Sequence, residues 1–324
     1  MIQNNFCIVG YGKHAKNKII PQLVKEKKII NGIITKKKIS SFKIFKNIDE
    51  AILKIDKKNT FILCSPPHIH ADQAIKILKS GFNVIIEKPV TTKINDLKKI
   101  IKISNKQKLF FVESMMFQYS KSFKNFLEIF NKKKKKIKKI VLNFIIPSYE
   151  NQTFRSENQK YSVNLFDIGC YPVSLINSLF KNIKLKIIKI KNLNILKKEI
   201  IYITNVNNKN VEIIIKIGLG LKYKNEIILQ LDKETIYKFH PFFYGREGIR
   251  YLETKIRKYN KTYKFIEKNS FSNLLNVKTK VWNKTQRSRN KLMLKNLSSL
   301  ENLNNQYNKL VRKKNDIQIF NFNR

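Results

Sequence analysis

The feature that most constrains the fold is an alternation of short apolar runs with amphipathic segments, from Phe6 to about Phe117. Parallel strands need helical crossovers between them, so this alternation predicts an open, parallel α/β sheet. We expect strands at residues 5–9, 30–35, 60–64, 83–87 and 109–112, with helices at 15–26, 48–55, 67–80 and 94–105. Residues 1–119 are therefore assigned to one α/β domain.

Beyond Ser120 the pattern becomes a succession of longer apolar runs that are typical of β-strands. These runs cover residues 140–146, 184–190, 200–206, 211–217 and 225–231, and helical patterns cover 121–130, 171–180 and 270–313. Strands that follow one another directly favour an antiparallel sheet. We expect residues 120–324 to form an α+β domain with a large, open, mostly antiparallel sheet.

A glycine turn follows the first expected strand and opens the first helix. Its residues are Gly10, Tyr11, Gly12, Lys13, His14 and Ala15. In this GxGxxA pattern the first glycine permits a tight turn, the second lets the backbone approach a pyrophosphate, and the alanine lets helix and strand pack closely. The helix N-terminus offers N–H groups to the phosphates. The pattern therefore predicts a dinucleotide-binding domain.

The end of the second strand bears on which dinucleotide binds. Proteins that prefer NAD place a carboxylate there, about 20 residues after the glycines, to hold the ribose 2′-hydroxyl. Here the segment reads Thr35, Lys36, Lys37 and contains no carboxylate, and cations suit the 2′-phosphate of NADP. Because lysine is abundant throughout the chain, the segment favours NADP and leaves NAD open.

Two more strand ends carry polar or charged residues. The third strand is followed by Ser65, Pro66, Pro67, His68 and His70, and the fourth by Glu87, Lys88 and Pro89. Ligands bind beyond the carboxyl ends of the strands in open α/β sheets, so both segments should line the cofactor crevice. The two histidines lie near Cys64 but have no further His or Cys close in sequence, so no metal site is expected.

These motifs continue with Glu113, with Phe154-Arg155 and with the run Asp167-Ile168-Gly169-Cys170-Tyr171-Pro172. Their order resembles the glucose-fructose oxidoreductase / inositol dehydrogenase (Gfo/Idh/MocA) family over at least residues 6–180. The resemblance implies a Rossmann domain, then an α+β domain with the substrate site and often an oligomer interface. The activity that it implies is hydride transfer between NAD(P) and a hydroxyl or keto carbon of a sugar, nucleotide-sugar or related polyol.

The resemblance also implies which residues form the site. For the cofactor these are Gly10, Tyr11, Gly12, Lys13, His14, Ala15, Thr35, Lys36, Lys37, Ser65, Pro66, Pro67, His70, Glu87, Lys88 and Glu113. For the substrate they are Arg155, Asp167 and Tyr171. The expected partner is accordingly a small molecule, and a homo-oligomer, dimer or tetramer, is expected from the family.

Three of these residues are candidates for catalysis. Hydride addition to a ketone creates an alkoxide that needs a proton donor, and the reverse reaction needs a base. Lys88 matches the family's catalytic lysine and would stabilise the developing oxyanion, while Tyr171 would donate or accept the proton. Asp167 would position the substrate. The alternatives are a helix cap for Asp167 and a half-buried core aromatic for Tyr171.

The net charge of +45 over 324 residues needs an explanation of its own. Only eight of the 67 basic residues are Arg, and the lysines are spread over nearly every segment. Nucleic-acid readers cluster their charge and favour Arg, so no nucleic-acid partner is expected. No apolar run approaches the ~18 residues that span a bilayer, and no secretion pattern opens the chain. Together with three isolated cysteines, this predicts a cytoplasmic protein without a membrane partner.

A second functional class stays open at this point. A non-catalytic member of the same fold, which senses a dinucleotide or binds a protein, would need the glycine turn but neither Lys88 nor Tyr171. Many family members have a glycine-rich stretch where this chain has residues 162–164. How this loop approaches the substrate therefore stays open.

Overall fold

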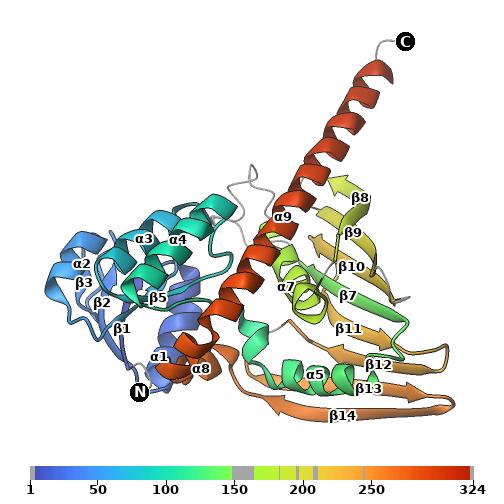
Figure 1. Cartoon of the computed structure of the whole chain (residues 1–324), viewed down its shortest axis with the longest axis horizontal. Helices are drawn as coiled ribbons and strands as arrows, with labels where there is room; N and C mark the ends of the chain where they lie inside the picture. Colours follow the sequence, from blue (N-terminus) through green and yellow to red (C-terminus); the bar gives the residue numbers. More distant parts are fainter. Residues whose placement is uncertain are drawn as a thin grey trace. The chain divides into compact units, whose positions relative to one another are not determined.

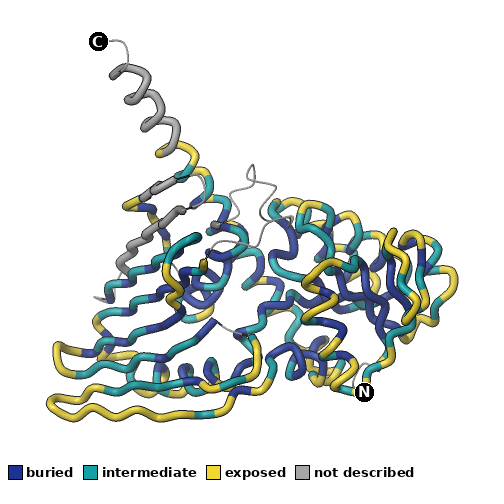
Figure 2. Tube along the Cα trace, turned by 180° about the vertical axis from the view of Figure 1, so that it is seen from behind, coloured by how far each residue is buried: buried dark blue, intermediate teal, exposed yellow. Residues whose placement is uncertain are grey.

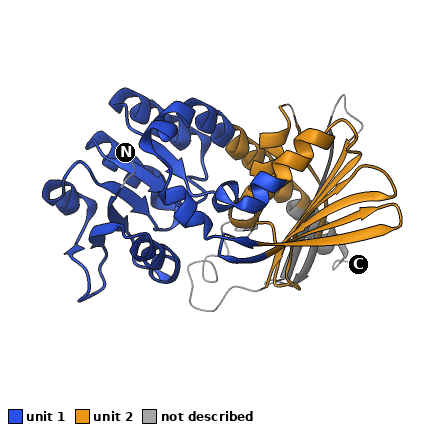
Figure 3. Cartoon of the chain, turned by 90° about the horizontal axis from the view of Figure 1, so that it is seen from below, with its two compact units in different colours: residues 1–125, 244–249, 266–294 blue, residues 126–243, 250–265, 295–324 orange. Residues whose placement is uncertain are grey.

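The structure is a computed structural model that describes residues 4–147, 164–181, 183–194, 197–206, 211–243 and 245–321. The chain divides into two compact units, coloured separately in Figure 3. Unit 1 comprises residues 1–125, 244–249 and 266–294, and unit 2 comprises residues 126–243, 250–265 and 295–324. Residues 244–249 and 266–294 thus belong to unit 1 although they follow unit 2 in the sequence. A single boundary between residues 119 and 120 does not describe this division.

Unit 1 contains a six-stranded parallel sheet with the strand order β3-β2-β1-β4-β5-β6 (Figure 1). The strands are β1 (Asn5–Val9), β2 (Ile29–Ile34), β3 (Ile44–Phe45), β4 (Thr60–Leu63), β5 (Asn83–Ile86) and β6 (Phe111–Glu113). The strand order reverses between β1 and β4, where open α/β sheets bind their ligands. The predicted parallel α/β domain is confirmed.

Helical segments connect these strands. They are the π-helical turn η1 (Ala15–Ile19) with α1 (Ile20–Lys25), α2 (Ile48–Lys54), the 3-10 turn η2 (Pro67–Ile69) with α3 (His70–Lys79), and α4 (Ile94–Gln107). Local sequence explains several of their ends. Asn47 caps α2, because its Oδ1 accepts a hydrogen bond of 2.9 Å from the N–H of Glu50.

The returning segments of unit 1 complete its core. They contain α8 (Ser270–Leu275) and the first part of α9 (Thr279–Asn321), which follow the last strand of the chain. Trp282 of α9 is 4% exposed and packs with Phe6, Ile8 and other apolar residues of the sheet in one buried cluster. Arg289 stacks on the Trp282 ring at 4.9 Å. Burial lowers the pKa of this guanidinium to about 10.

Unit 2 contains an eight-stranded sheet with the order β14-β13-β12-β11-β7-β10-β9-β8. The strands are β7 (Lys139–Ile146), β8 (Lys186–Asn194), β9 (Lys197–Val206), β10 (Val211–Leu219), β11 (Lys224–Gln230), β12 (Thr235–His240), β13 (Gly248–Ile256) and β14 (Tyr259–Glu267). β7 and β10 pair in parallel, whereas the other pairings whose register is established are antiparallel. The expected mostly antiparallel sheet is confirmed.

The helical segments of unit 2 include most of α5 (Lys121–Lys133), the π-helical turn η4 (Asn164–Gly169) and α7 (Cys170–Leu179). The remainder of α9 belongs to the same unit. None of the helices in the described ranges combines the length and the apolar character needed to cross a membrane.

Four strands, β3 in unit 1 and β12, β13 and β14 in unit 2, were absent from the sequence-based expectation. For β13 and β14 the reason is visible in Figure 2, where their hairpin is exposed along most of its length. Residues 255–264 are all exposed, so neither face of the hairpin end carries an apolar repeat. A strand without a buried face has no alternation of apolar and polar residues by which its sequence could be recognised.

Candidate functional site

The glycine turn follows β1 in unit 1. Gly10 has φ +96° and donates its N–H to the carbonyl of Ile34 at 2.9 Å. A Cβ at this position would lie 3.2 Å from the carbonyl carbon and oxygen of Cys64, so both the backbone conformation and the space require glycine. A Cβ on Gly12 would meet no atom within 4 Å. The turn therefore leaves room beside Gly12, as the approach of a pyrophosphate demands.

The helix that follows the turn begins without a side-chain cap. His14 stands at its N-cap position, and its side chain makes no capping hydrogen bond. Ala15 is fully buried in the core cluster, which allows the helix to pack closely on the sheet. Tyr11 is partly buried against the same cluster, while Lys13 is exposed. Uncapped N–H groups and a positive dipole end suit the phosphates of a dinucleotide.

An ion pair links this helix start to the end of β5. Nε2 of His14 lies 3.2 Å from Oε1 of Glu87, whose side chain is 13% exposed. Burial by itself raises the pKa of Glu87, but the neighbouring charges of His14 and Lys88 outweigh burial and hold the pKa below its usual value. The end of β5 therefore carries a carboxylate that stays ionised.

His70 joins the segments that follow β4 and β5. Its ring is fully buried, with Nδ1 3.0 Å from the carbonyl oxygen of Pro89 and Nε2 2.8 Å from that of Ser65. Burial lowers the pKa of His70, although both carbonyl contacts act in the opposite direction. Since a neutral imidazole has one N–H, it donates to one of these carbonyls at a time. The ring thus positions the two segments.

The residues around His70 begin the next helix. Ser65 donates its hydroxyl to Oε1 of Gln73 at 2.5 Å. Pro66 is extended and Pro67 is the first residue of η2, where a missing N–H leaves no helical hydrogen bond unmade. The expected positions of Ser65, Pro66 and Pro67 beyond a strand end are therefore observed.

Lys88 and Glu113 stand at the ends of the neighbouring strands β5 and β6, where Ile86 pairs with Glu113. Lys88 is partly buried, and its peptide bond to Pro89 is cis. Oε1 of Glu113 accepts a hydrogen bond of 3.3 Å from the N–H of Val90. Burial raises the pKa of Glu113 to about 7, against the opposing effects of that hydrogen bond and of Lys88. These strand ends therefore carry one ammonium and two carboxyl groups, of which Glu87 has a lowered pKa and Glu113 a raised pKa.

Glu113 makes stability depend on pH in a defined direction. Its folded-state pKa of about 7 lies above the ordinary 4.5. The protein therefore loses stability as the pH rises from about 4.5 through 7, whereas below about 4.5 the carboxyl is protonated in both the folded and the unfolded state and no stability is lost. Glu113→Gln has no proton to lose. We expect equal stability of variant and parent at pH 4, and a gain of about 3 kcal/mol at pH 8, measured by urea unfolding. The exposed Glu128→Gln should change neither value, and a Glu113→Gln loss at pH 8 would contradict the assignment.

The end of β2 carries the residues expected at the ribose. Oγ1 of Thr35 accepts a hydrogen bond of 3.1 Å from the N–H of Lys37. Thr35 is partly buried, whereas Lys36 and Lys37 are exposed. The turn therefore presents two cations and no carboxylate beyond the strand end.

The other candidate residues belong to unit 2. Asp167 lies in the π-helical turn η4, where its carbonyl oxygen is 3.4 Å from Sγ of Cys170. Tyr171 lies in the first turn of α7 and is partly exposed. Its ring meets Phe144 and Phe243 edge-on, with centroid distances of 5.2 and 6.1 Å. Pro172 follows within the same first turn, where proline is tolerated. Arg155 lies outside the described residues.

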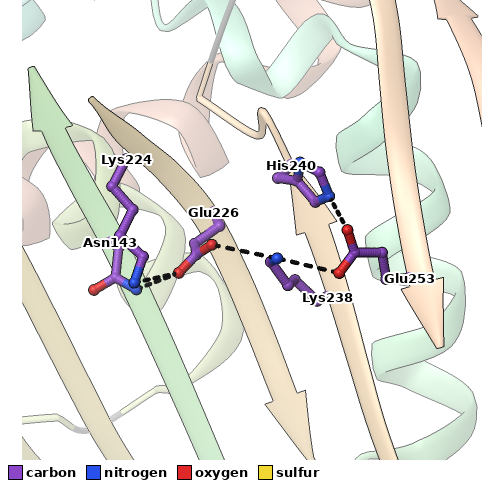
Figure 4. A network of polar contacts seen from close by, with 6 residues as sticks. All are labelled: Asn143, Lys224, Glu226, Lys238, His240 and Glu253. Atoms are coloured by element: carbon purple, nitrogen blue, oxygen red, sulfur yellow. Dashed lines mark hydrogen bonds and ion pairs between the residues drawn. The ribbon is translucent and has the colours of Figure 1, made fainter. Parts of the chain in front are cut away.

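A charged network across four strands of unit 2 had no counterpart in the sequence motifs (Figure 4). Nε2 of His240 lies 2.6 Å from Oε1 of Glu253, and Nζ of Lys238 lies 3.1 Å from its Oε2. Glu226 is 3.8 Å from the same ammonium and 2.6 Å from Nδ2 of Asn143. Burial acts to raise the pKa of Glu253, but these hydrogen bonds hold the pKa below its usual value. The network joins β7, β11, β12 and β13.

Comparison with known proteins matches residues 4–115 to a family described as "Oxidoreductase family, NAD-binding Rossmann fold", which is Gfo/Idh/MocA. A solved structure of KijD10, a 3-ketoreductase from Actinomadura kijaniata in complex with TDP-benzene and NADP, has a TM-score of 0.74 at 14% identity, covering 93% of this chain and 96% of that one. A dehydrogenase from Chromobacterium violaceum has a TM-score of 0.77 at 12% identity, covering 98% and 99%.

The probable oxidoreductase yhhX has a TM-score of 0.69 at 15% identity, covering 92% of this chain and 95% of that one. At such identities the structural likeness shows the fold, and it extends over both units. The family match confirms that the N-terminal segment is an NAD-binding Rossmann domain. Residues 4–115 thus match the Gfo/Idh/MocA oxidoreductase family, as the glycine turn and the Glu87-Lys88-Pro89 motif predict.

Proposed function

We propose that the chain is an NADP-dependent oxidoreductase that transfers hydride to or from a hydroxyl or keto carbon of a sugar or nucleotide-sugar. The observation that carries this proposal is Lys88, which lies with Glu87 and Glu113 at the carboxyl ends of β5 and β6. The complex of KijD10 with TDP-benzene and NADP supports both the cofactor and a nucleotide-linked substrate. A cytoplasmic location and a homo-oligomer belong to the same proposal.

The residues of unit 1 would hold NADP at two of its groups, the pyrophosphate and the ribose 2′-phosphate. Gly10, Gly12 and the uncapped helix start would receive the pyrophosphate, and Lys36 and Lys37 the ribose 2′-phosphate. His70 would keep the segments after β4 and β5 in place beside it. When bound, the nicotinamide supplies or accepts the hydride.

The catalytic roles follow from what each side chain can do. The Lys88 ammonium would stabilise negative charge that develops on the substrate oxygen, and Glu87 would remain ionised beside it. The Tyr171 hydroxyl would donate a proton to that oxygen in reduction and receive it in oxidation. Asp167, in the preceding turn, would hold substrate hydroxyl groups in place.

The test is an assay of cofactor turnover over a panel of substrates. The protein is incubated with NADPH and free or nucleotide-linked keto-sugars, and NADPH oxidation is followed by absorbance. We expect turnover with at least one nucleotide-linked keto-sugar. Tight NADPH binding with no turnover on the whole panel would contradict the proposal and favour the dinucleotide-sensing alternative. Light scattering on the same sample reads the oligomeric state.

The preference for NADP depends on the two exposed lysines after β2. Lys36→Ala together with Lys37→Ala removes the cations expected at the 2′-phosphate. We expect the Kd of NADPH to rise about 10-fold to 100-fold while the Kd of NADH is unchanged, because the two lost charge-assisted contacts are together worth roughly 1.4–2.8 kcal/mol. Calorimetry with both cofactors measures this. The control replaces the exposed Lys58 and Lys106 instead, and an equal loss there would assign the effect to general charge.

A further inference from the structure

Asn225 of β11 is a buried amide that holds the turn after β12. Its side chain is 4% exposed. Oδ1 accepts hydrogen bonds from two successive backbone N–H groups, those of Phe242 at 3.1 Å and Phe243 at 2.7 Å. Nδ2 donates to the hydroxyl of Tyr223 at 2.9 Å. The amide therefore fixes the backbone of this turn to the sheet of unit 2.

The turn that Asn225 holds presents a ring against which Tyr171 packs. The Phe243 ring lies 6.1 Å from the Tyr171 ring and 5.3 Å from the Phe144 ring. Phe144 is itself 5.2 Å from Tyr171 and pairs with Asn225 directly across the ladder of β7 and β11. Both rings beside Tyr171 are therefore linked to Asn225. Phe144 is its partner across the ladder, and the N–H of Phe243 donates to its side chain.

We propose that Asn225 is a positioning residue for the Tyr171 phenol and acts through the backbone and ring of Phe243. The inference rests on the proposed function, in which Tyr171 exchanges the proton. Proton transfer needs the phenol within hydrogen-bond reach of the reacting oxygen, and a displacement of about 1 Å costs up to ~100-fold in rate. Loss of the amide frees the N–H of Phe243, whereas that of Phe242 still donates to the backbone carbonyl of Asn225 at 3.2 Å, so the Phe243 ring can move.

The chain offers matched variants for the test. Asn225→Ala removes all three side-chain hydrogen bonds, whereas Asn225→Asp keeps an oxygen for the two N–H groups and can accept from the Tyr223 hydroxyl. The control is Asn143→Ala. Asn143 is 3% exposed and lies in the neighbouring strand, but adjacent to Phe144 and hence on the opposite face of the sheet.

A substrate-free measurement reads the position of Tyr171 directly. The protein contains 13 Tyr and is labelled with 3-fluorotyrosine for 19F NMR, and the resonance lost in Tyr171→Phe belongs to Tyr171. The resonance of Tyr223 is assigned in the same way. We expect Asn225→Ala to shift or broaden the Tyr171 resonance, and Asn225→Asp and Asn143→Ala to leave it in place. An unmoved Tyr171 resonance in Asn225→Ala overturns the inference.

Activity with NADPH and the keto-sugar panel separates this inference from the proposed function. We expect Asn225→Ala to lower kcat about 10-fold to 100-fold without changing the Kd of NADPH, with rescue by Asn225→Asp. If kcat of Asn225→Ala falls no more than that of Asn143→Ala, this inference is overturned and the proposed function is not. Full activity of Tyr171→Phe overturns the proton role and the inference with it. If Asn225→Ala does not fold, Phe243→Leu removes the same ring contact and should move the same resonance.

Discussion

Lys88→Ala lowers kcat of the proposed hydride transfer by about 10²-fold to 10⁴-fold and leaves the Kd of NADPH within about threefold. The lysine stands at the end of β5, where its charge acts on both Glu87 and Glu113. Without it, negative charge on the substrate oxygen would develop beside two carboxyl groups and no ammonium. Steady-state kinetics and calorimetry measure the two effects separately.

Lys88→Arg is the matched control, because it keeps the positive charge but replaces a compact ammonium with a planar guanidinium. We expect it to retain more activity than Lys88→Ala and less than the parent. Activity of Lys88→Ala within about twofold of the parent would remove Lys88 from the chemistry. A loss that appears only in the Kd of NADPH would assign it to cofactor binding.

We expect Glu267→Ala to lower the free energy of unfolding by about 3 kcal/mol. Glu267 is 1% exposed and lies at the end of β14. Oε1 accepts from the N–H of Lys121 at 2.8 Å, and Oε2 accepts from the N–H and the hydroxyl of Ser122 at 2.9 and 3.2 Å. The carboxylate therefore binds the first N–H groups of α5, where the helix dipole favours negative charge.

Urea unfolding measures this effect against two other variants. Glu267→Gln keeps one acceptor oxygen but turns an amino group toward the helix, so we expect a loss of about 1–2 kcal/mol. Glu234→Ala removes an exposed carboxylate and should change stability by less than about 0.5 kcal/mol. Equal midpoints for Glu267→Ala and Glu234→Ala would show that the cap contributes nothing.

The sequence was sufficient for those parts of the fold whose strands have a buried face. The strands β1, β2, β4, β5 and β6 begin and end within two residues of the expected bounds, because each is an apolar run between polar turns. β3 has two residues, Ile44 and Phe45, and is too short to form a pattern. The hairpin of β13 and β14 is exposed on both faces over residues 255–264 and therefore carries no alternation.

In the candidate site, too, some residues could be predicted from local sequence and others could not. The glycine turn, Lys88 and Glu113 lie beside strand ends, so local motifs place them once a parallel sheet is expected. Contacts that depend on distant pairing could not be predicted. Glu267 binds Ser122 across 145 residues of sequence, and Glu226 meets Lys238 only because β11 and β12 pair in one register. Such pairs exist only after the sheet has formed.

Transfer of deuterium from the cofactor tests the central proposal most directly. NADPH deuterated at C4 of the nicotinamide, in either stereochemical form, is incubated with the protein and each nucleotide-linked keto-sugar, and the product is analysed by mass spectrometry. We predict that one labelled form delivers a single deuterium to the reduced carbon, and that Lys88→Ala delivers almost none in the same time. Bound NADPH that passes no deuterium to any sugar of the panel would contradict hydride transfer as the function of this chain.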